Sequence, residues 1–314
     1  MIKLTVKSLL MLLVMAGLFA ALWVAPGRYT HDLAAIVNKR EMLTTSRPPR
    51  IIFMGGSSLL SLDSPSIERA TGRQVINMGL WGGLSLRSYV EEIKDDLRPG
   101  DTVVITQEYS TVMDRDYVTF INTNEESKKF LMLLSPGRHL TRYCRQGRWF
   151  EAFTLMMQLV QMKNKALIQN LLTLKWEKIA TNGYIYYEEE FNACGDRVRP
   201  FKILRPLDSA GIRFSPPDMR NHLYLNDVYR FAQQRGVKLL YYFSHFPEKE
   251  FRANQKVIAA LHEQLRANLR MPIINTPEDM MFPEDHFADT VYHLNTKGEA
   301  VRTKKIIQYL KRYL

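Results

Sequence analysis

Three residues that can cooperate in nucleophilic catalysis stand near opposite ends of this 314-residue chain. Ser57 follows a short apolar run at 51–54 and two glycines, whereas Asp289 and His293 precede a glycine and a basic segment close to the end. A strand that breaks into two glycines lifts the serine to the carboxyl end of the strand, where open α/β sheets bind small molecules. The order serine, acid, histidine suits a triad. We therefore predict Ser57 as nucleophile, His293 as base and Asp289 as orienting acid, with Ser57 Oγ within about 3.5 Å of His293 Nε2.

Two members of this triad also have a plainer structural alternative. A serine after a strand is often only a helix cap, and an aspartate ahead of a helix is often an N-cap. The neighbouring Ser58 is a second candidate for the nucleophile. No metal site is expected, because the two Cys and seven His are never spaced as zinc ligands and the acidic residues never form a calcium loop. No cofactor is expected either.

The two end segments resemble blocks of the SGNH/GDSL hydrolase superfamily over residues 50–110 and 220–312. The first block of that superfamily is a Gly-Asp-Ser turn, and Gly56 stands here where the aspartate usually is. The second block is a glycine after a buried strand and an asparagine, which the run VINMGLWGG at 75–83 matches. The resemblance implies Gly82 and the backbone amide of Ser57 as oxyanion-hole donors, Gly79 as the alternate glycine, and a supporting role for Asn77.

Two departures from the superfamily pattern bear on catalysis. The third block should place an asparagine after the strand at 102–107, but Glu108, Tyr109 and Ser110 stand there. A carboxylate cannot donate to a developing negative charge unless it is protonated. Asp289 also lies four residues before the histidine, whereas three is the usual spacing. Both features are similar to the branch that acylates cell-envelope polymers, such as periplasmic alginate O-acetyltransferases and teichoic-acid D-alanyl transfer proteins.

This resemblance implies an SGNH-type O-acyltransferase or esterase. The expected activity is transfer of an acyl group, acetyl first of all, to or from a cell-envelope polysaccharide through an acyl-serine intermediate. A membrane-bound O-acyltransferase is the expected partner, since the acyl donor must reach the outer side. The alternative is a catalytically weak scaffold or polymer-binding protein in a polysaccharide modification or export complex, which the missing asparagine block favours.

Two further residues are candidates for the site. His245 follows the apolar run at 237–243, so it should lie at the carboxyl end of a strand and contact substrate. Arg302 lies in the last helix, one turn past Gly298. It is expected either to fix the motif or bind an acid group, or to pair with a carboxylate as a buried structural arginine.

The amino terminus predicts a membrane anchor. Residues 8–25 contain no charge and reach roughly 27 Å as a helix, which is enough to cross a bilayer core. The context of Ala25 and Pro26 is poor for signal-peptide cleavage. We therefore expect a retained signal anchor over 1–30, with Lys3 and Lys7 inside and the rest of the chain in the periplasm or otherwise outside the inner membrane.

The chain is strongly basic, with a net charge of +11, of which Lys3, Lys7 and Arg28 supply three and leave +8 outside the anchor. Such a charge attracts a polyanion or an anionic membrane surface, or simply keeps the domain soluble. Nucleic acid is an implausible partner for an exported domain. Cys144 and Cys194 are the only two cysteines. They are expected either to form a disulfide or to stay as two buried thiols.

The remaining chain predicts an α/β fold, a flavodoxin-like three-layer SGNH domain over 50–314 after a polar linker at 31–49. Its parallel sheet should alternate with helices, because apolar runs alternate with amphipathic stretches. The predicted strands are 50–54, 74–78, 102–107, 237–243 and 271–274, and the predicted helices are 64–71, 84–97, 221–235, 249–269 and 296–313.

A helical insertion over about 111–220 interrupts this alternation. Its longest amphipathic stretch is 149–176, and the turn at Gly195 and Asp196 follows an acidic, aromatic segment. Ahead of that stretch, basic and aromatic residues are interleaved, as expected either of a surface that meets a headgroup layer or a polymer or of a solvated helix face. They are Arg138, His139, Arg142, Tyr143, Arg145, Arg148 and Trp149.

Overall fold

The computed structural model describes residues 2–24, 31–80, 82, 84–114, 132, 134–164, 191–205, 207, 212–217 and 219–314. The chain divides into two compact units. Met1–Ala34 and Pro136–Tyr186 form the first unit, and Ala35–Ser135 and Tyr187–Leu314 form the second, here called the sheet domain. The sheet domain therefore begins before residue 50, and only the middle of the predicted insertion leaves it.

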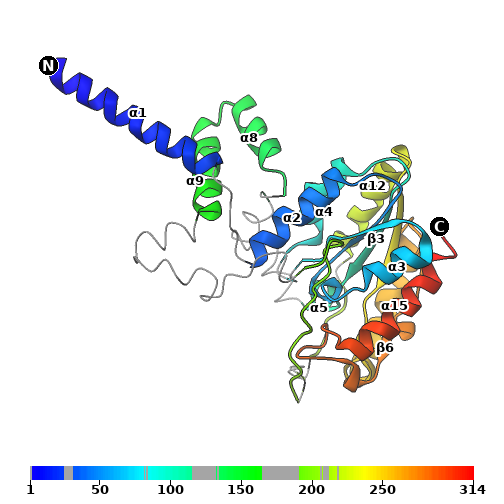
Figure 1. Ribbon diagram of the computed structural model, residues 1–314. Coiled ribbons are helices and arrows are strands. Elements are labelled where there is room, and N and C mark those ends of the chain that lie inside the picture. Colours follow the sequence, from blue (N-terminus) through cyan, green and yellow to red (C-terminus); the bar gives the residue numbers. More distant parts are fainter. Residues whose placement is uncertain are drawn as a thin grey trace. The chain divides into compact units, whose positions relative to one another are not determined.

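Four parallel strands form the sheet of this domain (Figure 1). They are β1 (Arg50–Met54), β2 (Gln74–Asn77), β3 (Thr102–Gln107) and β4 (Lys238–Phe243), in the order β2-β1-β3-β4. The predicted mixed α/β fold with a parallel sheet is confirmed. The fifth predicted strand, 271–274, is reduced to a single parallel bridge between Tyr241 and Ile273. A two-stranded parallel sheet of β5 (Phe246–Pro247) and β6 (Met281–Phe282) lies beyond β4 in the chain.

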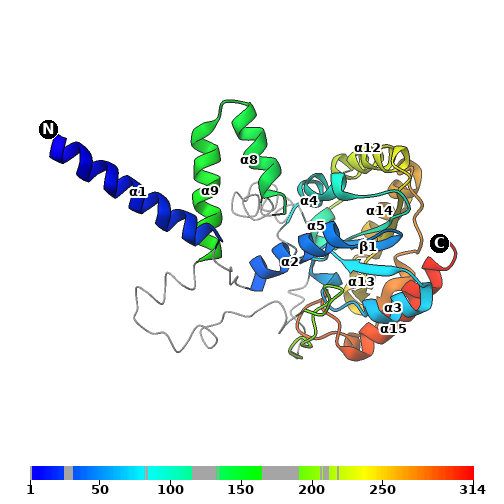
Figure 2. The same cartoon turned by 45° about the horizontal axis from the view of Figure 1, so that its top comes forward.

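Helices cover both faces of the sheet, as Figure 2 shows. On one face lie α3 (Ser64–Thr71) and α15 (Thr296–Leu310), and on the other lie α4 (Leu86–Ile93) and α12 (Arg220–Gln234). Alternate strand residues point to opposite faces. Ile51, Phe53, Leu240 and Tyr242 accordingly share one core with Ile67 of α3 and with Ile306 and Leu310 of α15. Since both faces are buried, the strands are continuous apolar runs and not alternating ones.

Two helix boundaries have a clear local cause. The side chain of Asn295 accepts from the amides of Lys297 and Gly298 at 3.0 and 3.2 Å, which starts α15 at the predicted cap. The predicted helix 249–269 is instead two helices, α13 (Glu248–Ala253) and α14 (Gln255–Asn268). The chain breaks at Asn254, whose side chain bonds the backbone of Phe214 at 2.9 Å and of Ile212 at 3.0 Å.

The predicted polar linker 31–49 is wrong for most of its length, because residues His31–Thr45 form helix α2. Ile36, Lys39 and Leu43 recur at helical spacing and are fully buried. Lys39 tolerates this place because its amine donates to the carbonyls of Asn77 at 2.7 Å and Gly195 at 2.8 Å. Burial lowers the pKa of Lys39 to about 7.

The first unit contains α1 (Ile2–Val24), α8 (Pro136–Arg145) and α9 (Trp149–Lys163). In α1, the segment Thr5–Trp23 is long and apolar enough to cross a membrane, and none of it is buried. The predicted amphipathic stretch 149–176 is described only as far as residue 164, and the acidic segment at 184–190 lies outside the described residues. Cys144 and Cys194 are both free thiols, so the disulfide alternative is not realised.

The remaining helix and the 3₁₀ turns are short. They are α5 (Ser110–Met113) and the 3₁₀ turns η1 (Ser57–Leu59), η2 (Lys94–Asp96), η4 (Glu278–Met280) and η5 (Glu284–His286).

Candidate active site

Ser57, His293 and Asp289 meet at the carboxyl end of β1. Ser57 Oγ lies 3.0 Å from His293 Nε2, and His293 Nδ1 lies 2.8 Å from Asp289 Oδ1. The distance predicted from the sequence is therefore confirmed, and the four-residue spacing does not prevent Asp289 from reaching the ring. An aspartate on Nδ1 fixes the tautomer in which Nε2 accepts a proton from the serine. All three residues are partly exposed, so a substrate can reach them.

The local sequence explains why Ser57 stands at this point. The strand β1 ends at Met54, and the chain turns through two glycines into η1, which carries Ser57. A Cβ on Gly55 would lie 2.5 Å from the carbonyl oxygen of Thr106, so β3 approaches too closely for any side chain. The backbone amide of Leu59 donates to the carbonyl of Gly56 at 3.2 Å and closes the turn.

Glu108, at the carboxyl end of β3, fills the place that a side chain on Gly56 would need. Its Oε1 accepts from Ser57 Oγ at 3.1 Å and from the amide of Ser58 at 2.8 Å. A Cβ on Gly56 would lie 2.6 Å from the same oxygen. Gly56 and Glu108 are thus sterically linked. Burial raises the pKa of Glu108, and its hydrogen bonds from Ser57 and Ser58 only partly oppose that shift.

The expected oxyanion residues are not equivalent. Asn77 Oδ1 accepts from the amide of Gly79 at 2.8 Å, so that amide is already engaged. Asn77 Nδ2 donates to the carbonyl of Leu59 at 2.8 Å, which ties the end of β2 to the Ser57 turn. Gly82 is half-buried, and both of its neighbours lie outside the described residues. The resemblance leaves Gly82 and the Ser57 amide as the expected donors.

Arg302 and His245 are buried and hydrogen-bond to backbone carbonyls beside the site. Arg302 is buried and donates to the carbonyls of Ser58 at 2.5 Å and Ser61 at 2.6 Å, so it fixes the serine turn, and among the described residues it forms no ion pair with a carboxylate. His245 is 1% exposed, and its Nε2 donates to the carbonyl of Tyr292 at 2.7 Å. Burial holds the pKa of His245 well below its usual range. Because His245 is buried, its position does not support the expected contact with substrate. Its hydrogen bond instead fixes Tyr292, the residue before His293.

The sequence did not predict that residues 191–205 pack against the turn that carries Ser57. Asp196 is buried and accepts from Ser64 Oγ at 2.6 Å and from Asn77 Nδ2 at 2.9 Å. The amide of Arg197 donates to the carbonyl of Leu60 at 2.6 Å. The turn predicted at Gly195 and Asp196 is present, and the side chain of Asn192 caps it by accepting from the amide of Asp196 at 3.0 Å.

Phe201 in the same segment covers the imidazole of His293. Its ring stacks on His293 with centroids 3.9 Å apart and planes within 7°. The guanidinium of Arg197 lies over the same Phe201 ring, 4.3 Å from its centroid. Farther along, the amide of Leu204 donates to the carbonyl of Ala288 at 3.0 Å, next to Asp289. The segment therefore joins the serine turn to the loop that bears the acid and the base.

No protein-family model matches the chain, and no curated protein matches its sequence. Among the described residues, no three His, Cys, Asp or Glu side chains are placed to hold a metal ion. The chemistry supported by the arrangement is that of a hydroxyl nucleophile, a base that can carry its proton, and a carboxylate that orients the base.

Proposed function

We propose that this protein is an SGNH-type enzyme of flavodoxin-like fold that moves an acyl group through an ester on Ser57. The single observation that carries the proposal is the hydrogen-bonded chain from Ser57 Oγ through His293 to Asp289, at 3.0 and 2.8 Å. A serine that only capped a turn would not need a hydrogen bond to an imidazole whose other nitrogen is bonded to a carboxylate. The order of the three along the chain agrees with that of the superfamily.

In the first step, Ser57 Oγ attacks the acyl carbonyl carbon while its proton passes to His293 Nε2. The tetrahedral intermediate then collapses, the bond to the donor breaks, and the leaving group takes the proton from His293. In the second step, a sugar hydroxyl gives its proton to His293 and attacks the acyl-Ser57 ester; the bond from the acyl carbon to Ser57 Oγ breaks, and Oγ takes the proton back from His293. If water replaces the sugar hydroxyl, the same steps make an esterase.

Transfer to a cell-envelope polysaccharide is favoured over hydrolysis by the candidate anchor. An enzyme tethered through Thr5–Trp23 stays beside a membrane-bound donor of acyl groups, such as an O-acyltransferase partner. Lys3 precedes the span Thr5–Trp23 and Lys7 lies in its first turn, and positive charge at this end favours a sheet domain on the periplasmic or extracytoplasmic side. Acetyl is the acyl group that the resemblance favours.

A scaffold in a polysaccharide modification complex is the second candidate. The observation that favours it is Glu108, because an acceptor carboxyl stands beside Ser57 where the superfamily has an asparagine donor. Such a site would be weak in stabilising an oxyanion. The scaffold would need its surface but not the Ser57 hydroxyl.

Replacement of Ser57 separates the two candidates. We expect Ser57→Ala to abolish acylation of the envelope polymer in intact cells while the protein folds normally, since loss of one half-buried hydroxyl costs about 1 kcal/mol or less. Ser58→Ala is the matched control, because it removes the neighbouring, buried hydroxyl and should leave acylation in place. Acyl content of purified polymer and abundance of each variant are measured together. Unchanged acyl content with Ser57→Ala at normal abundance would leave only the scaffold.

A further inference from the structure

Helix α9 carries an exposed apolar stripe. Phe150, Phe153 and Met157 recur at helical spacing on one face, and their side chains are 78%, 55% and 42% exposed. Trp149 beside them is 66% exposed. The opposite face is occupied by Ala152 and Leu155, which are buried. Single exposed apolar side chains are ordinary, but four along one short helix mark a surface that meets an apolar medium.

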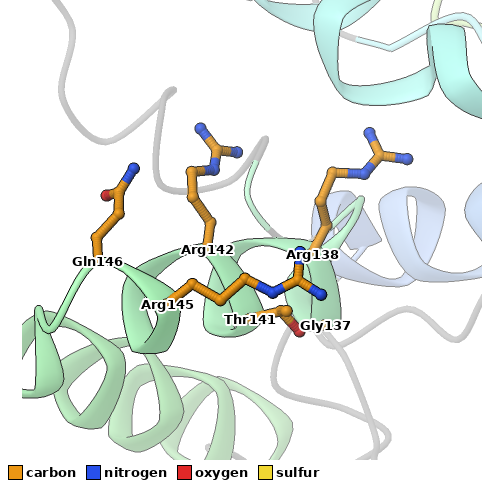
Figure 3. A pocket seen from close by; sticks show the side chains of 6 residues that line it. All are labelled: Gly137, Arg138, Thr141, Arg142, Arg145 and Gln146. Carbon is orange, nitrogen blue, oxygen red and sulfur yellow. The ribbon is translucent and has the colours of Figure 1, made fainter.

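The preceding helix α8 adds a row of arginines and contains no acidic residue. Arg138, Arg142 and Arg145 line an open pocket of about 530 Å³ together with Gly137, Thr141 and Gln146. Figure 3 shows the three arginines on one helix, with Arg138 and Arg142 pointing away from it and Arg145 running along it toward Thr141. A pocket walled by guanidinium groups and a threonine hydroxyl suits phosphate oxygens, which accept several donors at once.

The basic and the aromatic residues meet where α8 turns into α9. Gly147 adopts a positive φ of 70° in this turn, which brings the two helices together as a hairpin. The guanidinium of Arg148 lies 4.8 Å from the ring centroid of Tyr143 and its Nε donates to Glu151 at 2.9 Å. We call Pro136–Arg145 and Trp149–Lys163 with their connecting turn the basic hairpin.

The far end of the basic hairpin is fixed to the candidate anchor. Asn164, directly after α9, is buried and donates to the carbonyl of Leu22 at 3.0 Å. Leu22 belongs to the last turn of α1, within the apolar span Thr5–Trp23. Figures 1 and 2 both show α9 ending at this end of α1. A helix of 15 residues is about 22 Å long, so every residue of α9 lies within about that distance of the end of α1.

We propose that the basic hairpin lies on the surface of the membrane that α1 crosses and binds anionic phospholipid. The arginines of α8 hold lipid phosphates, and Trp149, Phe150 and Phe153 enter the boundary between headgroups and acyl chains. The proposal rests on α1 being a retained anchor and not on catalysis. An acidic polysaccharide could also pair with the arginines, but it offers no apolar medium to the phenyl rings, so the lipid surface fits both features.

The test places a nitroxide on the stripe in the full-length protein. Phe150→Cys, with Cys144→Ala to remove the half-buried native thiol, is labelled and reconstituted into nanodiscs of phosphatidylcholine with or without phosphatidylglycerol. Leu223→Cys on α12 of the sheet domain is the control, since Leu223 is also an exposed apolar residue. With phosphatidylglycerol, the ratio of collision rates with oxygen and with a water-soluble nickel complex should be at least about threefold higher at position 150 than at position 223. Equal ratios at both positions would overturn the proposal.

A charge variant tests the role of the arginines. Arg142→Gln with Arg145→Gln should lower the ratio at position 150 by about threefold in phosphatidylglycerol discs. Arg230→Gln with Arg235→Gln removes the same charge from α12 and the residue that follows it, and should change nothing. No effect of the α8 pair would contradict the lipid-phosphate contact, and protection that requires added acidic polysaccharide would identify a polymer as occupant. Failure of the protein to co-purify with discs would overturn this inference while leaving acyl transfer untouched.

Discussion

Ser57 shares one hydroxyl between two acceptors. His293 Nε2 lies 3.0 Å and Glu108 Oε1 lies 3.1 Å from Ser57 Oγ, and the hydroxyl has a single proton to donate. An ionised Glu108 competes with the base for that proton. A neutral Glu108 can donate to Ser57 Oγ instead and leave the hydroxyl proton directed at His293. Burial favours the neutral form by raising the pKa of Glu108.

This competition predicts a change in the pH dependence of Ser57 acylation. As pH rises through the raised pKa of Glu108, the carboxyl ionises, and the rate should fall below the value set by His293 alone. Glu108→Gln cannot ionise and should lack this loss. The rate of acylation by p-nitrophenyl acetate is measured from acid to alkaline pH for both proteins. Glu248→Gln, on the exposed start of α13, is the control and should keep the wild-type profile. Identical profiles for wild type and Glu108→Gln would refute the competition.

The same residues show what the sequence could predict at this scale. Ser57, Asp289 and His293 were found because three chemical types stood in a workable order beside glycines. The link between Gly56 and Glu108 was not, because a steric exchange between residues 52 positions apart leaves no pattern in either segment. Phe201 was missed for the same reason, since a single aromatic residue in a basic segment gives no indication that it stacks on a distant imidazole.

At the scale of elements, the strands were easier to predict than the segments between them. The strands β1, β3 and β4 were predictable, because apolar runs between helices favour a parallel sheet. Helix α2 was missed because its buried face contains Lys39, a residue type that is normally exposed. Here its amine is buried because it donates to two backbone carbonyls. The break at Asn254 was missed since it depends on the backbone of residues 212–214.

Lys39 makes the stability of the sheet domain depend on pH. Its pKa is lowered from 10.5 to about 7 in the fold, so between these pH values the unfolded chain holds a proton that the folded chain does not. The free energy of unfolding should therefore rise with pH in this window, by about 1.4 kcal/mol per pH unit. Lys39→Met should remove this contribution to the slope. Urea unfolding at several pH values measures it, with Lys256→Met on the exposed face of α14 as control. A slope that persists in Lys39→Met would contradict this assignment.

For the whole molecule, the central question is whether α1 remains attached. The span Thr5–Trp23 is exposed along its length, as a membrane helix requires, and its carboxyl end is bonded to Asn164 of the same unit. A cleaved signal peptide would have no such partner in the mature chain. The division into two units follows from this arrangement: one unit contains the candidate anchor and the basic hairpin, and the other contains the triad.

A retained anchor predicts a protein of full length in the membrane fraction. Mass spectrometry of protein purified from membranes should find residues 1–25 still attached, because the residues around Ala25 and Pro26 are a poor cleavage site. A charged substitution in the span, Leu13→Arg, should weaken membrane retention, whereas Leu13→Ile should not. A mature amino terminus near residue 26 in the soluble fraction would rule out the anchor.

The most direct measurement of the central claim is the site of covalent labelling. The full-length protein is treated with a fluorophosphonate, which reacts with serines activated by a neighbouring base, and the adduct is located by peptide mass spectrometry. We predict one adduct, on Ser57, formed at least about a hundredfold more slowly in His293→Ala because the base no longer takes the proton. An unlabelled Ser57, or labelling at a rate that His293→Ala does not change, would contradict the account.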